Sequence, residues 1–313
     1  MEAEFPQIAV NLCQEHLDAT DTFMHAEGVD SRAHQALESA GFFNIQPSRV
    51  YIGSYYCEHL FLALSNARVR AFEAYCARTG ARASLVIPLC GESTVNRIVS
   101  LAESLIADHP FIDEVVVNDL GMLAHFANAF EKAPFAPDRP APAIMLGRLW
   151  HKEVRDPRYA ALMEKAHVIH EPAALPYSAA TAGFEIDPIG HTIDLSHAPE
   201  QKICALHIPY CHLSIGRICA AQSRDEDPSR KFLPGAPCGL ECMESFTWFN
   251  VETFPDPLEQ EDAPYESLGE TPILRKGRAV VFRNDQCQWS GGAPDRLIVA
   301  PRFAFDESEA IDD

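Results

Sequence analysis

The sequence lacks the features that mark secreted, membrane-spanning and nucleic-acid-binding proteins. Lys and Arg number 25 against 45 Asp and Glu, and the formal net charge is −20. A protein this acidic repels nucleic acid and anionic membranes unless it carries a local basic patch, and the sequence has none. The start, MEAEFPQIAV, has no basic region followed by an apolar run, and no stretch approaches the about 18 apolar residues of a membrane helix. We therefore expect a cytoplasmic protein without a membrane span that does not bind nucleic acid.

Several familiar catalytic motifs are also missing. The chain has no Gly-x-x-x-x-Gly-Lys-Ser/Thr, no Gly-x-Gly-x-x-Gly after a strand, no Gly-x-Ser-x-Gly and no His-Glu-x-x-His. The glycine pair in WSGGAPDR (Trp289–Arg296) predicts a turn, not a phosphate cradle. Ser214 lies two residues from His212, but proximity in sequence does not make a catalytic triad. The residues thus give little support to a nucleotide-binding or serine-hydrolase function.

Short apolar runs alternate with helical patterns along most of the chain, which is 47% hydrophobic. The strand candidates are Gln7–Leu12, Arg49–Gly53, Ala83–Pro88, Glu114–Asn118, Ala143–Leu146, His167–His170, Phe184–Ile186 and Lys202–Ile208, followed later by RAVVFRN and RLIVAPRF. The helix candidates are Asp30–Ala40 with Asp30 as its cap, Leu60–Thr79, Thr94–Ala107, Leu120–Lys132 and Asp156–Ala166. This alternation predicts one TIM-barrel-like α/β domain over residues 1–313 with a decorated C-terminal region. An acidic, proline-rich insert occupies residues 252–270.

Three acidic residues directly follow predicted strands: Asp119, Glu171 and Asp187. In a barrel, side chains at the carboxyl ends of the strands point into the active-site mouth, so these residues are acid–base candidates. Asp119 is equally suited to cap the following helix, and Asp187 to start a turn before Pro188. The sequence leaves both interpretations open.

Ten cysteines are present, and in a reducing cytosol they do not predict a disulfide framework. Cys211, Cys219, Cys238 and Cys242 crowd into the cysteine-rich loop 211–242, where the last two form a Cys-x3-Cys pair. Cys57 follows the second predicted strand and would reach the same end of a barrel. Four thiolates suit tetrahedral zinc or an iron–sulfur cluster, whereas burial as small apolar residues is the main alternative.

These segments resemble the peptidase U32 (collagenase-like) family, and most closely its UbiV-like branch. The similarity lies in Tyr51-Ile52-Gly53 within VYIGSYYC, in Ser214–Cys219 within HIPYCHLSIGRIC, and in CGLEC at Cys238–Cys242. It covers most of residues 7–242. Cys211 has no counterpart in the family pattern, and the spacing from Cys219 to Cys238 is longer than in the family.

The resemblance implies an α/β barrel with an oxygen-sensitive [4Fe-4S] cluster held by Cys57, Cys219, Cys238 and Cys242. It implies a subunit for oxygen-independent hydroxylation of an aromatic ring, as in ubiquinone biosynthesis, with prephenate as the oxygen source. It also implies a heterodimer with a related U32-family protein and a small aromatic or quinone-precursor substrate. Other members of the family are described as proteases or hydroxylate RNA bases. A non-catalytic partner stapled by zinc or a cluster is a further alternative. If the chain is a cluster-bearing hydroxylase subunit, Ser214 and Arg217 would lie near the sulfur atoms.

Overall fold

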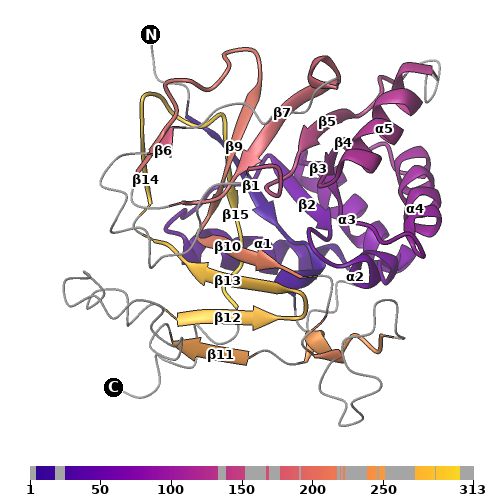
Figure 1. Ribbon diagram of the computed structural model, residues 1–313, viewed down its shortest axis with the longest axis horizontal. Coiled ribbons are helices and arrows are strands. Elements are labelled where there is room, and N and C mark those ends of the chain that lie inside the picture. The colour runs from indigo at the N-terminus through magenta and orange to yellow at the C-terminus, as the bar shows by residue number, and fades with distance from the viewer. Residues whose placement is uncertain are drawn as a thin grey trace.

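The structure is a computed structural model that describes residues 5–17, 25–132, 139–151, 167–168, 177–189, 192–216, 219, 221–222, 238–244, 247–250, 272–285 and 287–303. Eight parallel strands form a closed barrel in the order β1-β15-β9-β7-β5-β4-β3-β2 (Figure 1). These strands are β1 (Gln7–Asn11), β2 (Arg49–Gly53), β3 (Arg82–Ile87), β4 (Ile112–Val117), β5 (Ala143–Leu146), β7 (Thr181–Ile186), β9 (Ile203–Ile208) and β15 (Arg296–Val299). The predicted TIM-barrel-like fold is confirmed.

Alternation along each strand builds two apolar layers. Inward-facing residues such as Ala9, Tyr51 and Val86 form one buried cluster inside the barrel. Their neighbours in sequence, such as Val10 and Leu85, belong to a second cluster between the strands and the helices. A period of two is expected of strands whose two faces are both covered.

Five helices are described: α1 (Ala26–Ser39), α2 (Glu58–Leu62), α3 (Asn66–Thr79), α4 (Val95–Asp108) and α5 (Leu120–Lys132). In Figure 1, α2 to α5 lie along the part of the barrel formed by β2 to β5. No helix in the described part of the chain is long and apolar enough to cross a membrane. The described residues also form three short 3₁₀ turns: η1 (Gln14–His16), η3 (Ser178–Ala180) and η5 (Glu241–Met243).

Two smaller sheets flank the barrel. One is antiparallel, in the order β10-β13-β12-β11, and the other is parallel, in the order β14-β8-β6. Their strands are β10 (Tyr210–Ile215), β11 (Thr247–Asn250), β12 (Pro272–Lys276), β13 (Ala279–Arg283), β6 (His167–Val168), β8 (Thr192–Asp194) and β14 (Gln288–Ser290). Because β10 follows β9 almost directly, the antiparallel sheet starts at the carboxyl ends of the barrel strands, which we call the barrel mouth.

Three sequence predictions need correction. The predicted helix 60–79 is two helices, because the Ser65 hydroxyl caps a new helix by accepting from the backbone nitrogen of Arg68 at 3.3 Å. Asp30 does not cap α1, which begins at Ala26; its carboxylate pairs instead with Arg78 at 3.2 Å. The strand predicted at His167–His170 is described only at 167–168 and pairs with β8 outside the barrel. The predicted helix 156–166 and the insert 252–270 lie outside the described residues.

Candidate functional site

The predicted cysteine ligands come together at the barrel mouth. Cys57 immediately precedes α2, Cys219 follows β10, and Cys242 lies in η5. These three share one buried apolar cluster with Leu60 and Ala221, and each is at most 6% exposed. Cys238 lies within electrostatic range of all three thiols and accepts a hydrogen bond from the Leu240 backbone nitrogen at 3.4 Å. We call Cys57, Cys219, Cys238 and Cys242 the cysteine cluster.

The protonation of the cysteine cluster is coupled. A hydrogen bond with Cys242 lowers the pKa of the Cys219 thiol to about 6. The same hydrogen bond, followed by burial and by the neighbouring thiols, raises the pKa of Cys242 far above its usual range. Burial raises the pKa of Cys57 to about 11, although the Arg278 charge opposes the shift. The protein alone therefore favours one thiolate, and four thiolates together require a cation to compensate them.

Gly277 lies directly against the cysteine cluster. This glycine is in the β12–β13 turn with a φ of +59°, where a side chain is strained. A Cβ atom at this position would lie 3.2 Å from Cys242 Cβ, 3.4 Å from Cys242 Sγ and 3.9 Å from Cys219 Sγ. The absence of a side chain thus leaves room beside two of the sulfur atoms.

The cysteine cluster is not arranged around a single ion. Among the residues that the structure describes, no group of three or more Cys, His, Asp or Glu side chains is placed to hold one metal ion. Cys211, the remaining thiol of loop 211–242, packs elsewhere, in an apolar cluster with Ile189, Ile273 and Phe282. The structure therefore separates Cys211 from the four predicted ligands. Residues 223–237 of the loop lie outside the described part of the chain.

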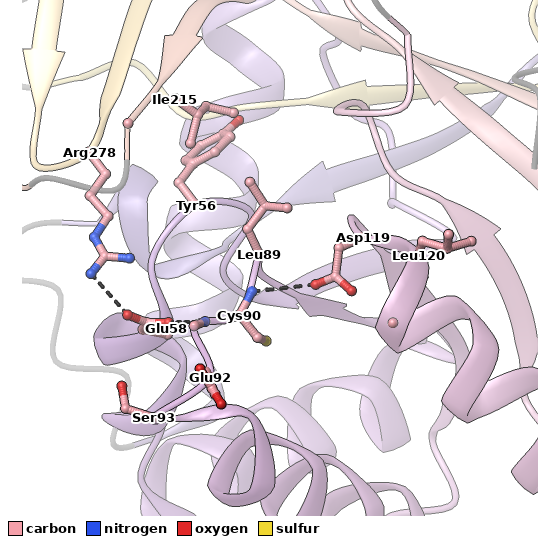
Figure 2. A pocket seen from close by; sticks show the side chains of 13 residues that line it. Tyr56, Glu58, Leu89, Cys90, Glu92, Ser93, Asp119, Leu120, Ile215 and Arg278 are labelled. Carbon is pink, nitrogen blue, oxygen red and sulfur yellow. Dashed lines mark hydrogen bonds and ion pairs between the residues drawn. The ribbon is translucent and has the colours of Figure 1, made fainter. Parts of the chain in front are cut away.

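A cavity of about 760 Å³ opens at the barrel mouth (Figure 2). Its walls are residues 89–93 after β3, residues 119–121 before and within α5, and residues 215–216 at the end of β10, together with Tyr56, Glu58 and Arg278. Tyr56 and Glu58 flank Cys57 in sequence, so one short segment contributes to both the cavity and the thiols. The cavity lies where parallel-barrel proteins place their binding sites.

An ion pair joins three segments at the cavity wall. Arg278 Nη2 donates to Glu58 Oε1 at 3.0 Å, and Glu58 Oε2 accepts from the Gly91 backbone nitrogen and from Thr94 Oγ1, each at 2.8 Å. Burial opposes ionisation of Glu58, but these hydrogen bonds and the Arg278 charge outweigh it and lower its pKa. Glu58 thereby holds the β12–β13 turn against the loop that follows β3.

A second, fully buried group of polar residues occupies the centre of the barrel mouth. Tyr55 Oη donates to Glu185 Oε2 at 2.9 Å, and His207 Nε2 lies 3.1 Å from the same oxygen. Arg148 Nη1 lies 3.2 Å from His207 Nδ1. Because a guanidinium only donates, Nδ1 accepts, and neutral His207 carries its proton on Nε2 and donates it to Glu185. We call Tyr55, Arg148, Glu185 and His207 the proton network.

Burial dominates the electrostatics of the proton network. It raises the pKa of Glu185 to about 8, although the Tyr55 hydrogen bond opposes the shift. It also raises the pKa of Glu15 to about 7; the Glu15 carboxylate accepts from the Tyr55 backbone nitrogen at 2.8 Å. Two carboxyl groups in the barrel mouth therefore titrate near neutral pH, as acid–base groups in active sites often do.

Polar contacts connect the proton network to the cavity. Arg148 forms an ion pair with Asp187, whose Oδ1 lies 3.6 Å from His212 Nδ1. His212 Nδ1 in turn lies 2.9 Å from the hydroxyl of Tyr56, and Tyr56 lines the cavity. A continuous polar path thus runs from the barrel centre to the cavity wall.

The sequence predictions of acidic and hydroxyl groups have different outcomes. Asp119 caps α5, because its Oδ1 accepts from the Met122 backbone nitrogen at 2.8 Å. Asp187 is completely buried in the barrel mouth. Glu171 and Arg217 lie outside the described residues, and Ser214 is exposed on β10.

Sequence reasoning missed most of the proton network, and it also missed a polar segment after β1. Buried side-chain atoms of Asn11, Glu15 and His16 have no hydrogen-bond partner within the described part of the chain. The available signal was their position in NLCQEH, immediately after the first strand, where barrel enzymes place functional groups.

Comparisons with known proteins identify no relative. No family model matches the chain, and neither a curated protein nor a solved structure matches it.

Proposed function

We propose that the chain is an iron–sulfur protein of the U32 peptidase-like type, with Cys57, Cys219, Cys238 and Cys242 as the ligands of a [4Fe-4S] cluster. In this proposal it is a subunit for oxygen-independent hydroxylation of a small aromatic substrate and pairs with a related chain. One observation carries the proposal: thiols from residue 57 and from residues 219–242 gather at the barrel mouth, although they are distant in sequence.

The surroundings of the thiols support a bulky, negatively charged group. The pocket around them is apolar, with Leu60 and Ala221 in the cluster and Leu240 and Met243 packed against it. Gly277 leaves space beside two sulfur atoms, and Arg278 supplies a positive charge. Arg278 Nε is buried without a partner among the described residues, so a hydrogen-bond acceptor is missing at this point. When bound, a cluster would supply one-electron chemistry, and hydrogen bonds to its sulfur atoms would tune its potential.

The cavity supports a small ring-bearing substrate. Leu89 and Leu120 are 37% and 54% exposed at its wall, and the rings and side chains of Tyr56 and Ile215 add apolar surface (Figure 2). Glu58 and Arg278 add polar atoms that can orient a substrate. A cavity that combines apolar surface with a few converging polar groups is typical of sites for small organic molecules.

The proton network supports chemistry that moves a proton. His207 Nε2 holds a proton against Glu185, and Arg148 fixes this tautomer from the other side of the ring. Hydroxylation of a ring displaces a C–H proton, which a relay of acid–base groups can carry away. Glu185 suits such a relay, because its pKa of about 8 lets it exchange its own proton close to neutral pH.

Proteolysis is supported less well. Ser214, the serine that lies near a histidine in the sequence, is exposed on β10 instead of being held in a buried site. The net charge of −20 also disfavours RNA as a substrate.

Anaerobic purification followed by metal and sulfide analysis tests the proposal. We expect a brown protein with about four iron atoms and four sulfides per chain. Cys57→Ala and Cys219→Ala should each lose most of the iron, whereas Cys211→Ala, which removes a buried thiol outside the cysteine cluster, should keep it. Stoichiometric zinc without visible absorption, or equal iron loss in all three variants, would contradict the proposal.

A further inference from the structure

Arg278 stands between the cavity and the cysteine cluster. It follows Gly277 in the β12–β13 turn, and its side chain is only 9% exposed. Figure 2 shows the guanidinium extending along the cavity wall toward Glu58. The ion pair with Glu58 uses Nη2, while the buried Nε has no partner among the described residues. One N–H of this arginine is therefore unsatisfied, on a side chain that lines the cavity.

The same guanidinium acts on the thiols. Its charge lies close enough to the sulfur atoms of Cys57, Cys219 and Cys238 to act on them electrostatically. Gly277, the preceding residue, lies next to the cysteine cluster: a Cβ atom added to it would lie 3.2 Å from Cys242 Cβ and 3.9 Å from Cys219 Sγ. The backbone of Arg278 thus lies next to the cysteine cluster, and its side chain lines the cavity.

The acidic side chains that line the cavity repel a bound anion only weakly, because two of them are already hydrogen-bonded and the third is exposed to solvent. The Glu58 carboxylate is compensated by Arg278, Gly91 and Thr94. The Asp119 carboxylate is used to cap α5 and lies 3.4 Å from the Cys90 backbone nitrogen. Glu92 is exposed to solvent. Among the described residues that line the cavity, Arg278 is consequently the positively charged one, and its Nε has no acceptor.

We infer that Arg278 binds the anionic oxygen of an aromatic carboxylate or phenolate in the cavity and couples this binding to the redox state of the cysteine-held cluster. Arg278 stabilises negative charge on both sides. An anion in the cavity offsets part of its charge, so the reduced, more negative cluster loses stabilisation and the midpoint potential falls. By linkage, the oxidised protein binds the anion more tightly by the same factor. The redox half of this inference rests on the proposed function.

The experiment uses benzoate as the anionic probe and benzamide as its neutral isostere. Binding is measured by calorimetry, and the midpoint potential by a redox titration followed by electron paramagnetic resonance on the iron-loaded protein. We expect benzoate to bind and shift the potential to more negative values, and benzamide to do neither. The same two measurements with phenolate, made at raised pH, show whether the cavity accepts a phenolate oxygen as well as a carboxylate oxygen.

Two variants of the ion pair provide opposite controls. Arg278→Gln should lower the potential in the absence of ligand, weaken benzoate binding at least tenfold and abolish the benzoate-induced shift. Glu58→Gln should raise the potential and tighten benzoate binding. Arg278→Lys keeps the charge and should keep the potential near that of the wild type, which a purely structural role would not predict.

The outcomes separate the two proposals. A wild-type chain without iron and sulfide contradicts the proposed function, whereas calorimetry with benzoate still tests the binding role of Arg278. Wild-type affinity for benzoate in Arg278→Gln, or an iron-loaded protein whose potential ignores benzoate, would overturn the inference.

Discussion

At the residue scale, the charge of the barrel mouth depends on where a few protons reside. Glu185 is completely buried, and its pKa rises from 4.5 to about 8. Between these two pH values the folded protein keeps a proton that the unfolded chain has released. Folding therefore takes up a proton in this window, and the free energy of unfolding must fall as the pH rises through it.

Glu185→Gln tests this linkage. In the wild type, we expect Glu185 to lower the free energy of unfolding by roughly 1.4 kcal/mol per pH unit up to about pH 8, and Glu15 to add a similar slope up to about pH 7. The variant should show a flatter profile, with a residual slope from Glu15, whose pKa of about 7 lies in the same window. Urea unfolding at a series of pH values measures the profile. Glu27→Gln, which alters an exposed carboxylate in the first turn of α1 beside Arg78, should leave the slope unchanged; a Glu185→Gln slope equal to that of the wild type would contradict the assignment.

At the scale of elements, the β12–β13 hairpin is the part that unites the cavity with the cysteine cluster. Its turn consists of Gly277 and Arg278, one against the sulfur atoms and the other against Glu58. A change in this turn should thus affect the proposed cluster site before it affects the barrel.

Gly277→Ala tests the role of the turn. The new methyl group would meet Cys242 and would also sit at a positive φ, so we expect the iron content to fall by at least half in a protein that remains folded. Gly80→Ala is the matched control, because this residue has a φ of +78° but no atom within 4 Å of the added Cβ. It should cost about 1 kcal/mol of stability and retain iron. Similar iron contents in both variants would show that the contact with Cys242 is unimportant.

The sequence predicts the elements well where periodicity is local. Helix α5 and strands β2 and β5 have the predicted bounds, because strong apolar patterns and clear breaks define them. The antiparallel sheet was largely missed, since β10 pairs with β13 across about seventy residues and no local pattern encodes such a pairing. Ser65 shows the remaining difficulty: one cap residue divides a continuous helical pattern.

One half of the candidate site, the cysteine cluster, could be predicted from the sequence, whereas the proton network could not. The cysteine positions stood out because thiols are rare and were clustered in sequence. Glu185, His207 and Arg148 did not stand out, since each is a single polar residue within or after an apolar strand. Their relation appears only when β5, β7 and β9 become neighbours in the barrel.

At the scale of the whole molecule, a buried ion pair crosses the barrel interior. Arg296 on β15 donates from Nη1 to Glu114 Oε1 on β4 at 2.8 Å, and both side chains are 2% exposed. Tyr51 and Ser84 add hydrogen bonds from two further strands. Strands on opposite sides of the barrel are thereby fixed to one another.

Glu114→Ala should therefore destabilise the entire barrel. Removing one partner leaves a buried, unpaired charge, which costs about 3–5 kcal/mol. Denaturant unfolding followed by circular dichroism measures the loss. Arg82→Ala, which removes an exposed partner of Asp113, should cost less than about 1 kcal/mol. Equal losses in both variants would mean that Arg296 finds another partner or that the pair contributes little.

The closing position of β15 has a consequence for synthesis on the ribosome. This strand lies between β1 and β9, yet it is the last of the eight to be translated. Until it emerges, the nascent chain presents two unpaired strand edges, and such edges invite association with other chains. The time between translation of β9 and of β15 is thus the period in which a chaperone would be most useful to this protein.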